Sequence, residues 1–248
     1  MEATTLARTR TAADRILEAI IGALPQFGPT DAIYLEKVTW DQYQQILEEQ
    51  ERLGRRLQIS YAAGRLEVLP NLFPAETRKC ILRLFVCLLA ESFEGELYSL
   101  GSSTLADKEK DFGFDPHESF LIQSADRVLF NDAGDLLCST PPDLVVEVEQ
   151  PNRKLNRLPM CARAAVPEVW YHDLDKLQFL SLQPNGTYAT IDASPAFPLV
   201  RSEELDGLLS GLTTRDLTAI ADEFRKWVGS IKPIEVKKAK SEAPCPTC

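Results

Sequence analysis

The clearest alternation of apolar and polar residues lies in the segment 141–150, PPDLVVEVEQ. Side chains of a strand point to alternate faces, and the β-branched valines favour a strand over a helix. One face then carries Leu144, Val146 and Val148, and the other carries Asp143, Val145, Glu147 and Glu149. An unpaired carboxylate is costly to bury, and a divalent metal such as Mg²⁺ is one partner that removes this cost. The pattern equally fits an ordinary amphipathic strand whose carboxylates face solvent.

Apolar residues at helical spacing predict five helices, at residues 12–24, 40–53, 76–93, 155–165 and 214–228. The helix 76–93 has the strongest apolar period, so we expect it to be the most buried. Thr39 is a candidate N-cap of the second helix, and Thr213 or Thr214 of the last. Pro159 is tolerated in the first turn of the fourth helix, because residues there donate no N–H group to the hydrogen bonds of the helix.

Short alternating or β-branched segments predict the strands. Residues 57–61 and 65–69 form one predicted hairpin with its turn at 62–64, and 176–182 and 188–191 form another around Asn185 and Gly186. Further strands are predicted at 97–100, 118–122 and 168–172. Residues 126–130 extend the region of 118–122, and a turn follows at 131–134. The segment 101–113, GSSTLADKEKDFG, is predicted to be a polar loop.

Helices before and after a set of mostly central strands indicate an α/β or α+β fold with a mixed sheet. A length of 248 residues is sufficient to bury one full core. We expect a helical extension at residues 1–30, a single domain at 31–230 and a disordered tail at 231–248, where Lys, Ser, Pro and Glu dominate.

Composition narrows the class of protein. Hydrophobic residues make up 44% of the chain and charged residues 26%, as in soluble globular proteins. No apolar run approaches the ~20 residues of a membrane span, and the first residues lack the apolar core of a signal peptide, so we expect a cytoplasmic protein with no membrane contact. The net charge of −10 argues against broad non-specific nucleic-acid binding but leaves room for a local basic groove.

The cysteines and histidines offer little conventional metal chemistry. Six cysteines show no compact disulfide spacing, which fits a reducing compartment. Cys245 and Cys248 form a CxxC in spacing only, and we interpret them as part of the disordered tail rather than as a zinc or redox site. With His117 and His172 as its two histidines, the chain has little material for a His-rich metal site.

Several short motifs occur in a characteristic order along the chain. They are 61–66 (YAAGRL), 101–104 (GSST), 113–120 (GFDPHESF), 142–148 (PDLVVEV) and 165–170 (AVPEVW). Taken together, this ordered set resembles the Uma-two family of restriction endonuclease-like proteins, over residues 33–212. The resemblance implies a PD-(D/E)XK nuclease fold, with a four-stranded mixed core sheet flanked by helices. It also implies Mg²⁺-dependent hydrolysis of DNA phosphodiester bonds, with Mn²⁺ as a possible substitute, and a homodimer is plausible for such folds.

The resemblance also implies a set of site residues. The glutamate of the long helix falls on Glu76, the glutamate of the carboxylate strand on Glu147, and the metal-binding aspartate on His117, after Asp115 and Pro116. The lysine that precedes the VPE motif falls on Arg157. Glu76, His117 and Glu147 are therefore the candidate metal ligands, and Glu147, Arg157 and Glu76 the candidate catalytic residues.

The chain departs from the family pattern at these positions. His117 is neutral and softer than an aspartate, and so it suits Mn²⁺ or Zn²⁺ better than Mg²⁺. Arg157 keeps the positive charge of lysine but does not transfer a proton at neutral pH. Cys161 stands where the family has tyrosine, and Glu149 where the superfamily has lysine.

Structural interpretations compete with these roles. Glu76 could be an acidic residue that the helix dipole favours, His117 a surface or core-capping residue, and Arg157 part of a solvated basic helix start. Glu147 lies mid-strand among apolar residues, and this position favours a site. Among the other candidates, Asp143 is interpreted as a strand-entry residue and Glu149 as a strand-end residue. Ser102, Ser103 and Thr104 are interpreted as loop residues and Lys154 as a helix-start residue. Trp170 and Tyr171 are interpreted as packing residues.

Two functional hypotheses follow from different classes. The first is a metal-dependent endonuclease, and it requires Glu76, His117, Glu147 and Arg157 to converge. The second is a catalytically degraded nuclease fold that acts as a nucleic-acid-binding or protein-interaction module. A basic rim around Glu147 would favour DNA, and an acidic or apolar rim would favour protein partners.

Overall fold

The computed structural model describes residues 18–20, 22, 32–52, 57–70, 73–124, 141–173, 175–212 and 216–231. The expected strand 126–130, the turn 131–134 and the tail with Cys245 and Cys248 lie outside these ranges. Of the expected helix 12–24, residues 18–20 and 22 are described, and they are helical. The division into extension, domain and tail therefore stays a prediction.

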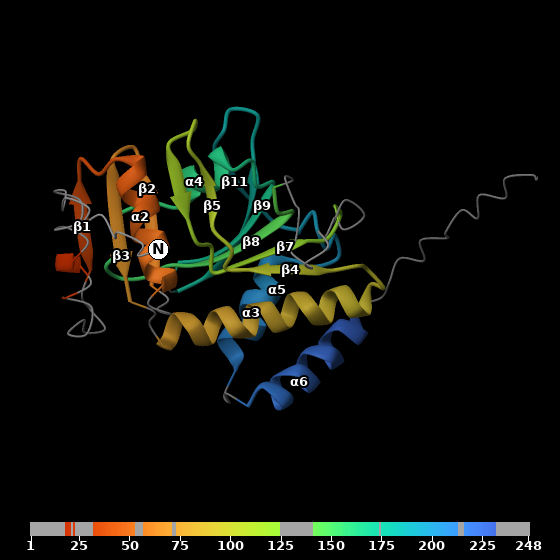
Figure 1. The fold of residues 1–248 in the computed structure, drawn as a ribbon. Helices are drawn as coiled ribbons and strands as arrows, with labels where there is room; N and C mark the ends of the chain where they lie inside the picture. The colour runs from red at the N-terminus through yellow and green to blue at the C-terminus, as the bar shows by residue number, and fades with distance from the viewer. Residues whose placement is uncertain are drawn as a thin grey trace, which may run out of the picture.

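Within the described residues, one sheet has five strands, all antiparallel, in the order β1-β3-β2-β6-β5 (Figure 1). Its strands are β1 (Ile33–Glu36), β2 (Gln58–Ala62), β3 (Arg65–Leu69), β5 (Leu105–Asp107) and β6 (Phe112–Phe114). The β2–β3 hairpin confirms its prediction, and its turn residues Ala63 and Gly64 both have positive φ, as a tight hairpin turn requires. We call this the small sheet.

A second, mixed sheet has six strands among the described residues, in the order β11-β10-β9-β8-β7-β4. These are β4 (Tyr98–Gly101), β7 (Glu118–Leu121), β8 (Leu144–Val148), β9 (Glu168–His172), β10 (Leu177–Leu182) and β11 (Tyr188–Ile191). β8 and β9 are parallel and the other neighbours are antiparallel. This main sheet confirms the expected mixed sheet flanked by helices.

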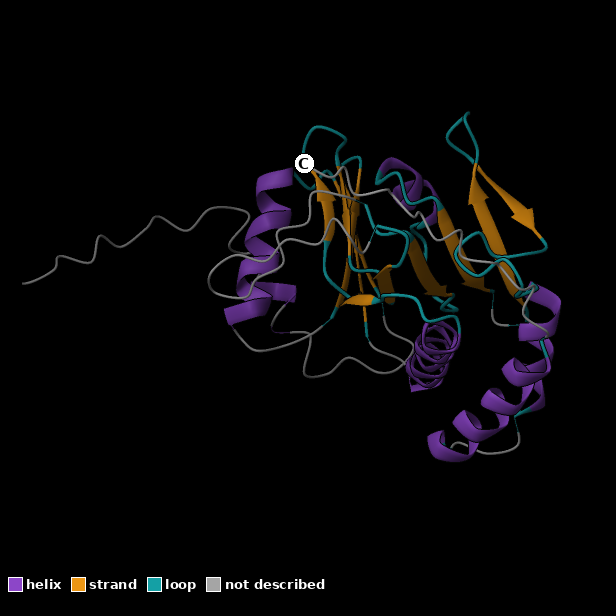
Figure 2. Cartoon of the chain, turned by 90° about the vertical axis from the view of Figure 1, so that its right-hand side faces the viewer, coloured by secondary structure: helices purple, strands orange, loops and turns teal. Residues whose placement is uncertain are grey.

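Helices cover the main sheet on one side. α3 (Phe73–Ser92) packs against β8 and α6 (Leu217–Ser230), while α5 (Ser202–Gly211) contacts β10 (Figure 1). α2 (Trp40–Arg52) packs on the small sheet through Tyr43 and Ile46, and the short α4 (Leu158–Arg163) connects β8 to β9. Figure 2 shows the helices around the strands from the side.

The faces of β8 follow the predicted alternation. Leu144, Val146 and Val148 join the core beneath α3, whereas Val145 packs with Phe112 and Phe114 of the small sheet. All five residues of β8 are buried, so the interpretation of Glu147 as part of a solvent-facing edge is wrong. β8 has a neighbour on each side, and the other sheet covers the face that carries Glu147.

Two other expectations were wrong, and one helix was not expected. The segment 101–113, expected to be a loop, contains β5 and the first two residues of β6, because strands of three residues are too short to show a period. α5 was missed, although Leu205, Leu208 and Leu209 have helical spacing after an acidic first turn. The side chain of Asp216 caps α6 through the Thr218 N–H, so the cap is neither Thr213 nor Thr214.

Candidate functional site

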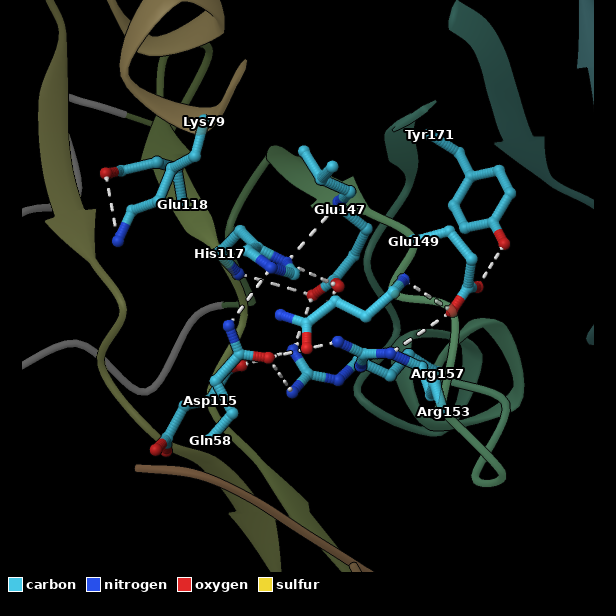
Figure 3. A network of polar contacts seen from close by, with 12 residues as sticks. Gln58, Lys79, Asp115, His117, Glu118, Glu147, Glu149, Arg153, Arg157 and Tyr171 are labelled. Atoms are coloured by element: carbon cyan, nitrogen blue, oxygen red, sulfur yellow. Dashed lines mark hydrogen bonds and ion pairs between the residues drawn. The ribbon is translucent and has the colours of Figure 1, made fainter. Parts of the chain in front are cut away.

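Glu147 is the centre of a buried polar cluster. Its side chain points from β8 towards the small sheet, and the residue is 2% exposed. Oε2 lies 2.9 Å from Nδ1 of His117, and Oε1 accepts from the His117 backbone N–H at 3.3 Å. Nη1 of Arg157 lies 3.1 Å from Oε1 and 3.3 Å from Oε2 (Figure 3). Both carboxylate oxygens are thus engaged by donors of this chain.

Chain topology explains why Arg157 reaches Glu147. The crossover from β8 to the parallel strand β9 passes through α4, and Arg157 is the residue immediately before this helix. Its Nη1 also donates to the Asp115 carbonyl oxygen at 2.5 Å, and its guanidinium lies 5.5 Å from the centroid of the Phe114 ring. The side chain is 3% exposed, so the solvated helix start proposed for Arg157 is wrong.

The hydrogen bonds of His117 assign its tautomer. The Glu147 carboxylate accepts, so Nδ1 carries the proton at the 2.9 Å contact. Nε2 then accepts from the Gln58 side-chain amide at 3.2 Å. The Val148 N–H lies 3.4 Å from the same Nδ1, a longer contact that does not change this assignment. His117 is therefore a neutral imidazole with both ring nitrogens occupied.

The charges of the cluster set its protonation states. Burial alone would raise the pKa of Glu147, but Arg157, His117 and Arg153 outweigh it and lower the pKa to about 2. Burial lowers the pKa of His117, with Arg157 and Arg153 adding repulsion against the attraction of Glu147. Glu147 is thus ionised and His117 neutral at physiological pH.

A second layer of polar residues surrounds this centre, and the sequence did not indicate two of its members, Gln58 and Arg153. Arg153 donates from Nη2 to Oε1 of Gln58 at 3.0 Å, and its Nε lies 3.3 Å from Glu149. Tyr171 donates to the same Glu149 carboxylate at 2.5 Å. Burial and the neighbouring Arg157 lower the pKa of Arg153 to about 10. The alternation of Leu57, Ile59 and Tyr61 could have placed Gln58 on the opposite face of β2, but not its partners.

Glu76 does not join the carboxylate of Glu147. It forms an ion pair of 3.5 Å with Lys79 on the next turn of α3, and Lys79 lies 3.8 Å from Glu118 of β7. Figure 3 shows Lys79 and Glu118 on a different side of His117 from Glu147. Burial raises the pKa of Glu118, despite Arg83 and Lys79. Of the four predicted residues, the structure brings together His117, Glu147 and Arg157.

Glu76 instead lines a pocket of about 610 Å³ beside the cluster. The pocket lies between the first turns of α3, the connection from β4 to β5 and the loop that carries Asp115 and His117. Its charged side chains are Lys79, Glu76 and Asp115, and the other polar ones include Gln50, Gln58, Ser102, Ser103 and Thr104. With one lysine against two carboxylates, the charged lining is net acidic, so the pocket does not meet the criterion of a basic rim for DNA.

The side chains present do not fit a Mg²⁺ ion in this arrangement. A hard cation needs free oxygen ligands, whereas Glu147 accepts from His117 and Arg157, and Nδ1 of His117 is a donor. In the part of the chain that the structure describes, no group of three His, Cys, Asp or Glu side chains is placed to hold a metal. Dependence on Mg²⁺ or Mn²⁺ stays a prediction without support from this geometry.

Three further candidates, Asp143, Trp170 and Cys161, lie outside the cluster around Glu147 or serve the packing of the fold. Asp143 accepts from the N–H groups of Ile122 and Ser124 at 2.7 and 2.8 Å, and so it holds the turn after β7. Trp170 is a core residue whose indole donates to Glu168 at 2.7 Å. Cys161 is buried, and burial raises the pKa of its thiol.

The mixed sheet, its flanking helices and the polar cluster at β8 define a mixed α/β protein with a buried ionic site between its two sheets. A family model, Uma2, described as "Putative restriction endonuclease", matches residues 40–219. The chain belongs to this family, which confirms the resemblance.

Comparison with known proteins adds two findings. One similar solved structure is a "putative nuclease belonging to DUF820" from Anabaena variabilis, with 16% identity and a TM-score of 0.41; the match covers 66% of this chain and 90% of that one. A search of curated proteins found no match. Among the described helices, none has the length and apolarity to cross a membrane.

Proposed function

We propose that this chain is a nuclease-family protein that binds DNA and leaves the phosphodiester bond intact. The observation that carries the proposal is the state of the Glu147 carboxylate, whose two oxygens accept from His117 and Arg157. Family membership supports DNA as the partner. The proposal corresponds to the second of the two hypotheses, with DNA as the ligand.

Hydrolysis by this family's expected chemistry needs a metal that polarises the phosphate and generates a hydroxide. In this chain the carboxylate of Glu147, on β8, neutralises the buried guanidinium of Arg157 instead of a metal. Release of Glu147 would require both Arg157 and His117 to leave, and Arg157 would then be buried without an anion. Breaking a buried ion pair in this way costs about 3–5 kcal/mol, so the closed arrangement is favoured over one that is open to a metal.

Binding does not need this carboxylate, because Glu147 does not line the pocket. The residues that line the pocket include Lys79 and Ser102, whose ammonium and hydroxyl groups can donate to a phosphate. The contacts of Lys79 to Glu76 and Glu118, at 3.5 and 3.8 Å, are longer than hydrogen bonds, so its ammonium can still donate to a phosphate oxygen. With Glu76 and Asp115 nearby, we expect weak binding with few phosphate contacts.

The test combines binding and cleavage on the same preparation. Anisotropy of a labelled DNA duplex in EDTA should show binding, and Lys79→Gln should weaken it while Lys176→Gln, exposed outside the pocket, should not. Supercoiled plasmid should stay intact with Mg²⁺ and with Mn²⁺. Nicking that Glu147→Ala abolishes would establish the metal-dependent endonuclease in place of this proposal. Absence of binding in well-folded protein would exclude DNA as the partner.

A further inference from the structure

We infer that Arg157 and His117 serve as an internal substitute for a divalent cation at Glu147, so that the chain joins its two sheets without a metal. The inference rests on the contacts of Glu147 and is independent of DNA binding. A metal in such a site would neutralise the buried carboxylate and connect the chain segments around it. The cluster does both with side chains.

Neutralisation comes from the guanidinium. Arg157 places one nitrogen near both carboxylate oxygens, at 3.1 and 3.3 Å, and its positive charge offsets the charge of the buried carboxylate. His117 adds a second donor at 2.9 Å without adding charge, because its imidazole is neutral. Two protein donors thus occupy the directions in which a cation would approach the carboxylate.

Connection between the sheets comes from Gln58 of β2, in the small sheet. Its amide donates to His117, and its oxygen accepts from Arg153 at 3.0 Å and from Arg157 at 3.4 Å. Glu67 of β3, in the same sheet, accepts from the backbone N–H of Leu155 at 3.0 Å. The crossover segment between β8 and α4 is therefore fixed to the small sheet at two places, while Glu147 fixes it to the main sheet.

The residue types at positions 117 and 157 then decide between an ion pair and a metal site. With Asp at 117 and a neutral, apolar residue at 157, two carboxylates would face each other without a cation. Like charges this close are unfavourable, so the site would gain affinity for a divalent cation. The double variant His117→Asp/Arg157→Met is thus expected to bind Mn²⁺, and the natural chain is not.

Thermal unfolding of EDTA-treated protein, with and without Mn²⁺, tests the inference. The natural chain should unfold at the same Tm in both conditions. Arg157→Met should lower the Tm by about 10 °C, because it leaves Glu147 charged and buried, and Glu147→Gln/Arg157→Met should recover most of this loss. Mn²⁺ should raise the Tm of His117→Asp/Arg157→Met and bind at about one ion per chain by electron paramagnetic resonance.

Opposite outcomes overturn the inference. A Tm of the natural chain that rises with Mn²⁺, and no longer does so in Glu147→Ala, would mean that Glu147 itself is a metal ligand. A double variant that neither binds Mn²⁺ nor gains stability from it would mean that positions 117 and 157 do not control access to the carboxylate. If Arg157→Met does not fold, the two double variants still test the inference. His117→Asp/Arg157→Met can bind a metal at Glu147, and Glu147→Gln/Arg157→Met has no charged carboxylate at position 147. No DNA is present in these measurements, so their outcome is separate from that of the binding test.

Discussion

Gln58 lies on β2 of the small sheet and His117 in the loop that leads into β7 of the main sheet, and the side-chain amide of Gln58 donates to Nε2 of the His117 imidazole at 3.2 Å. This contact places the neutral side chain of Gln58 between His117 and the guanidinium groups of Arg153 and Arg157. A glutamine suits this position because one end of its amide donates and the other end accepts. The arrangement of the charged residues around Glu147 therefore depends on an uncharged one.

Replacement of Gln58 should destabilise the fold without changing its net charge. Gln58→Leu keeps the volume but removes the partner of His117 Nε2 and one partner of each guanidinium group, at a cost of about 1–3 kcal/mol. Urea unfolding followed by tryptophan fluorescence would measure this loss. Gln45→Leu, on a half-exposed position of α2, is the matched control and should have little effect. Equal unfolding midpoints for the two variants would show that the Gln58 contacts contribute nothing.

Neutralisation of Glu147 should lower the free energy of unfolding more than neutralisation of Glu118. Glu147→Gln leaves the buried Arg157 without its anion, and we expect a loss of about 3–5 kcal/mol. Glu118 is equally buried, but its ion pairs with Lys79 and Arg83 span 3.8 and 3.7 Å, and burial raises its pKa. Glu118→Gln should therefore cost less than about 1 kcal/mol. Chemical denaturation of both variants at neutral pH compares them directly, and a reversed order would contradict the central role of Glu147.

The elements of the fold were predictable where a local signal defines them. Thr39 and Gln42 form the two reciprocal hydrogen bonds of a capping box, 2.8 and 3.2 Å long, and the Thr39 cap had been predicted. The alternation in β8 likewise predicted which side chains share a face. By contrast, β5 and β6 are each stabilised by pairing with a neighbouring strand, and three residues do not reveal such pairing.

The site was predictable only in part, for a related reason. The resemblance to the family selected Glu147, His117 and Arg157, and these three meet. It did not select Arg153 and Gln58, which lie 95 residues apart in the chain and meet only because the two sheets pack together. Nor did it indicate that the cluster would be closed, because the distance between a guanidinium and a carboxylate is a property of the packed fold.

The stability of the fold should decrease towards acid pH in two windows. His117 has a folded pKa below its ordinary 6.5, so below about pH 6.5 the unfolded chain takes up a proton that the folded chain refuses. Stability should fall there by up to about 1.4 kcal/mol per pH unit. Glu147, with a folded pKa of about 2 against an ordinary 4.5, adds a second loss as the pH falls from about 4.5 towards 2.

Substitution can test whether His117 causes the loss of stability below about pH 6.5. His117→Gln should flatten the dependence of the unfolding free energy between pH 7 and about 5, because glutamine does not titrate. Burial also lowers the pKa of His172, so His172→Gln is the control that removes the other histidine's contribution. If His117→Gln leaves the slope unchanged while His172→Gln removes it, folding does not shift the pKa of the imidazole at 117.

Gly113 has a packing requirement that can be tested separately from the site. A Cβ atom at this position would lie 2.3 Å from the Tyr43 hydroxyl and 2.7 Å from two of its ring carbons. Gly113→Ala should therefore destabilise the small sheet by about 1–3 kcal/mol. Tyr43→Leu in the same chain removes the clashing atoms, so the alanine should then cost less than in the natural background. Equal costs in the two backgrounds, measured by a double-mutant cycle, would show that Tyr43 is not the obstacle.

The salt dependence of DNA binding should be shallow if the pocket beside Glu76 and Lys79 is the contact site. One lysine among two carboxylates neutralises few phosphates, so the slope of log K against log salt should be about −1 to −2. A surface with six to ten phosphate contacts would give a slope of about −5 to −9. Lys79→Gln should make the slope less negative by about 0.9, since each phosphate contact contributes that amount. A steep slope that Lys79→Gln leaves unchanged would place the DNA on another surface of the protein.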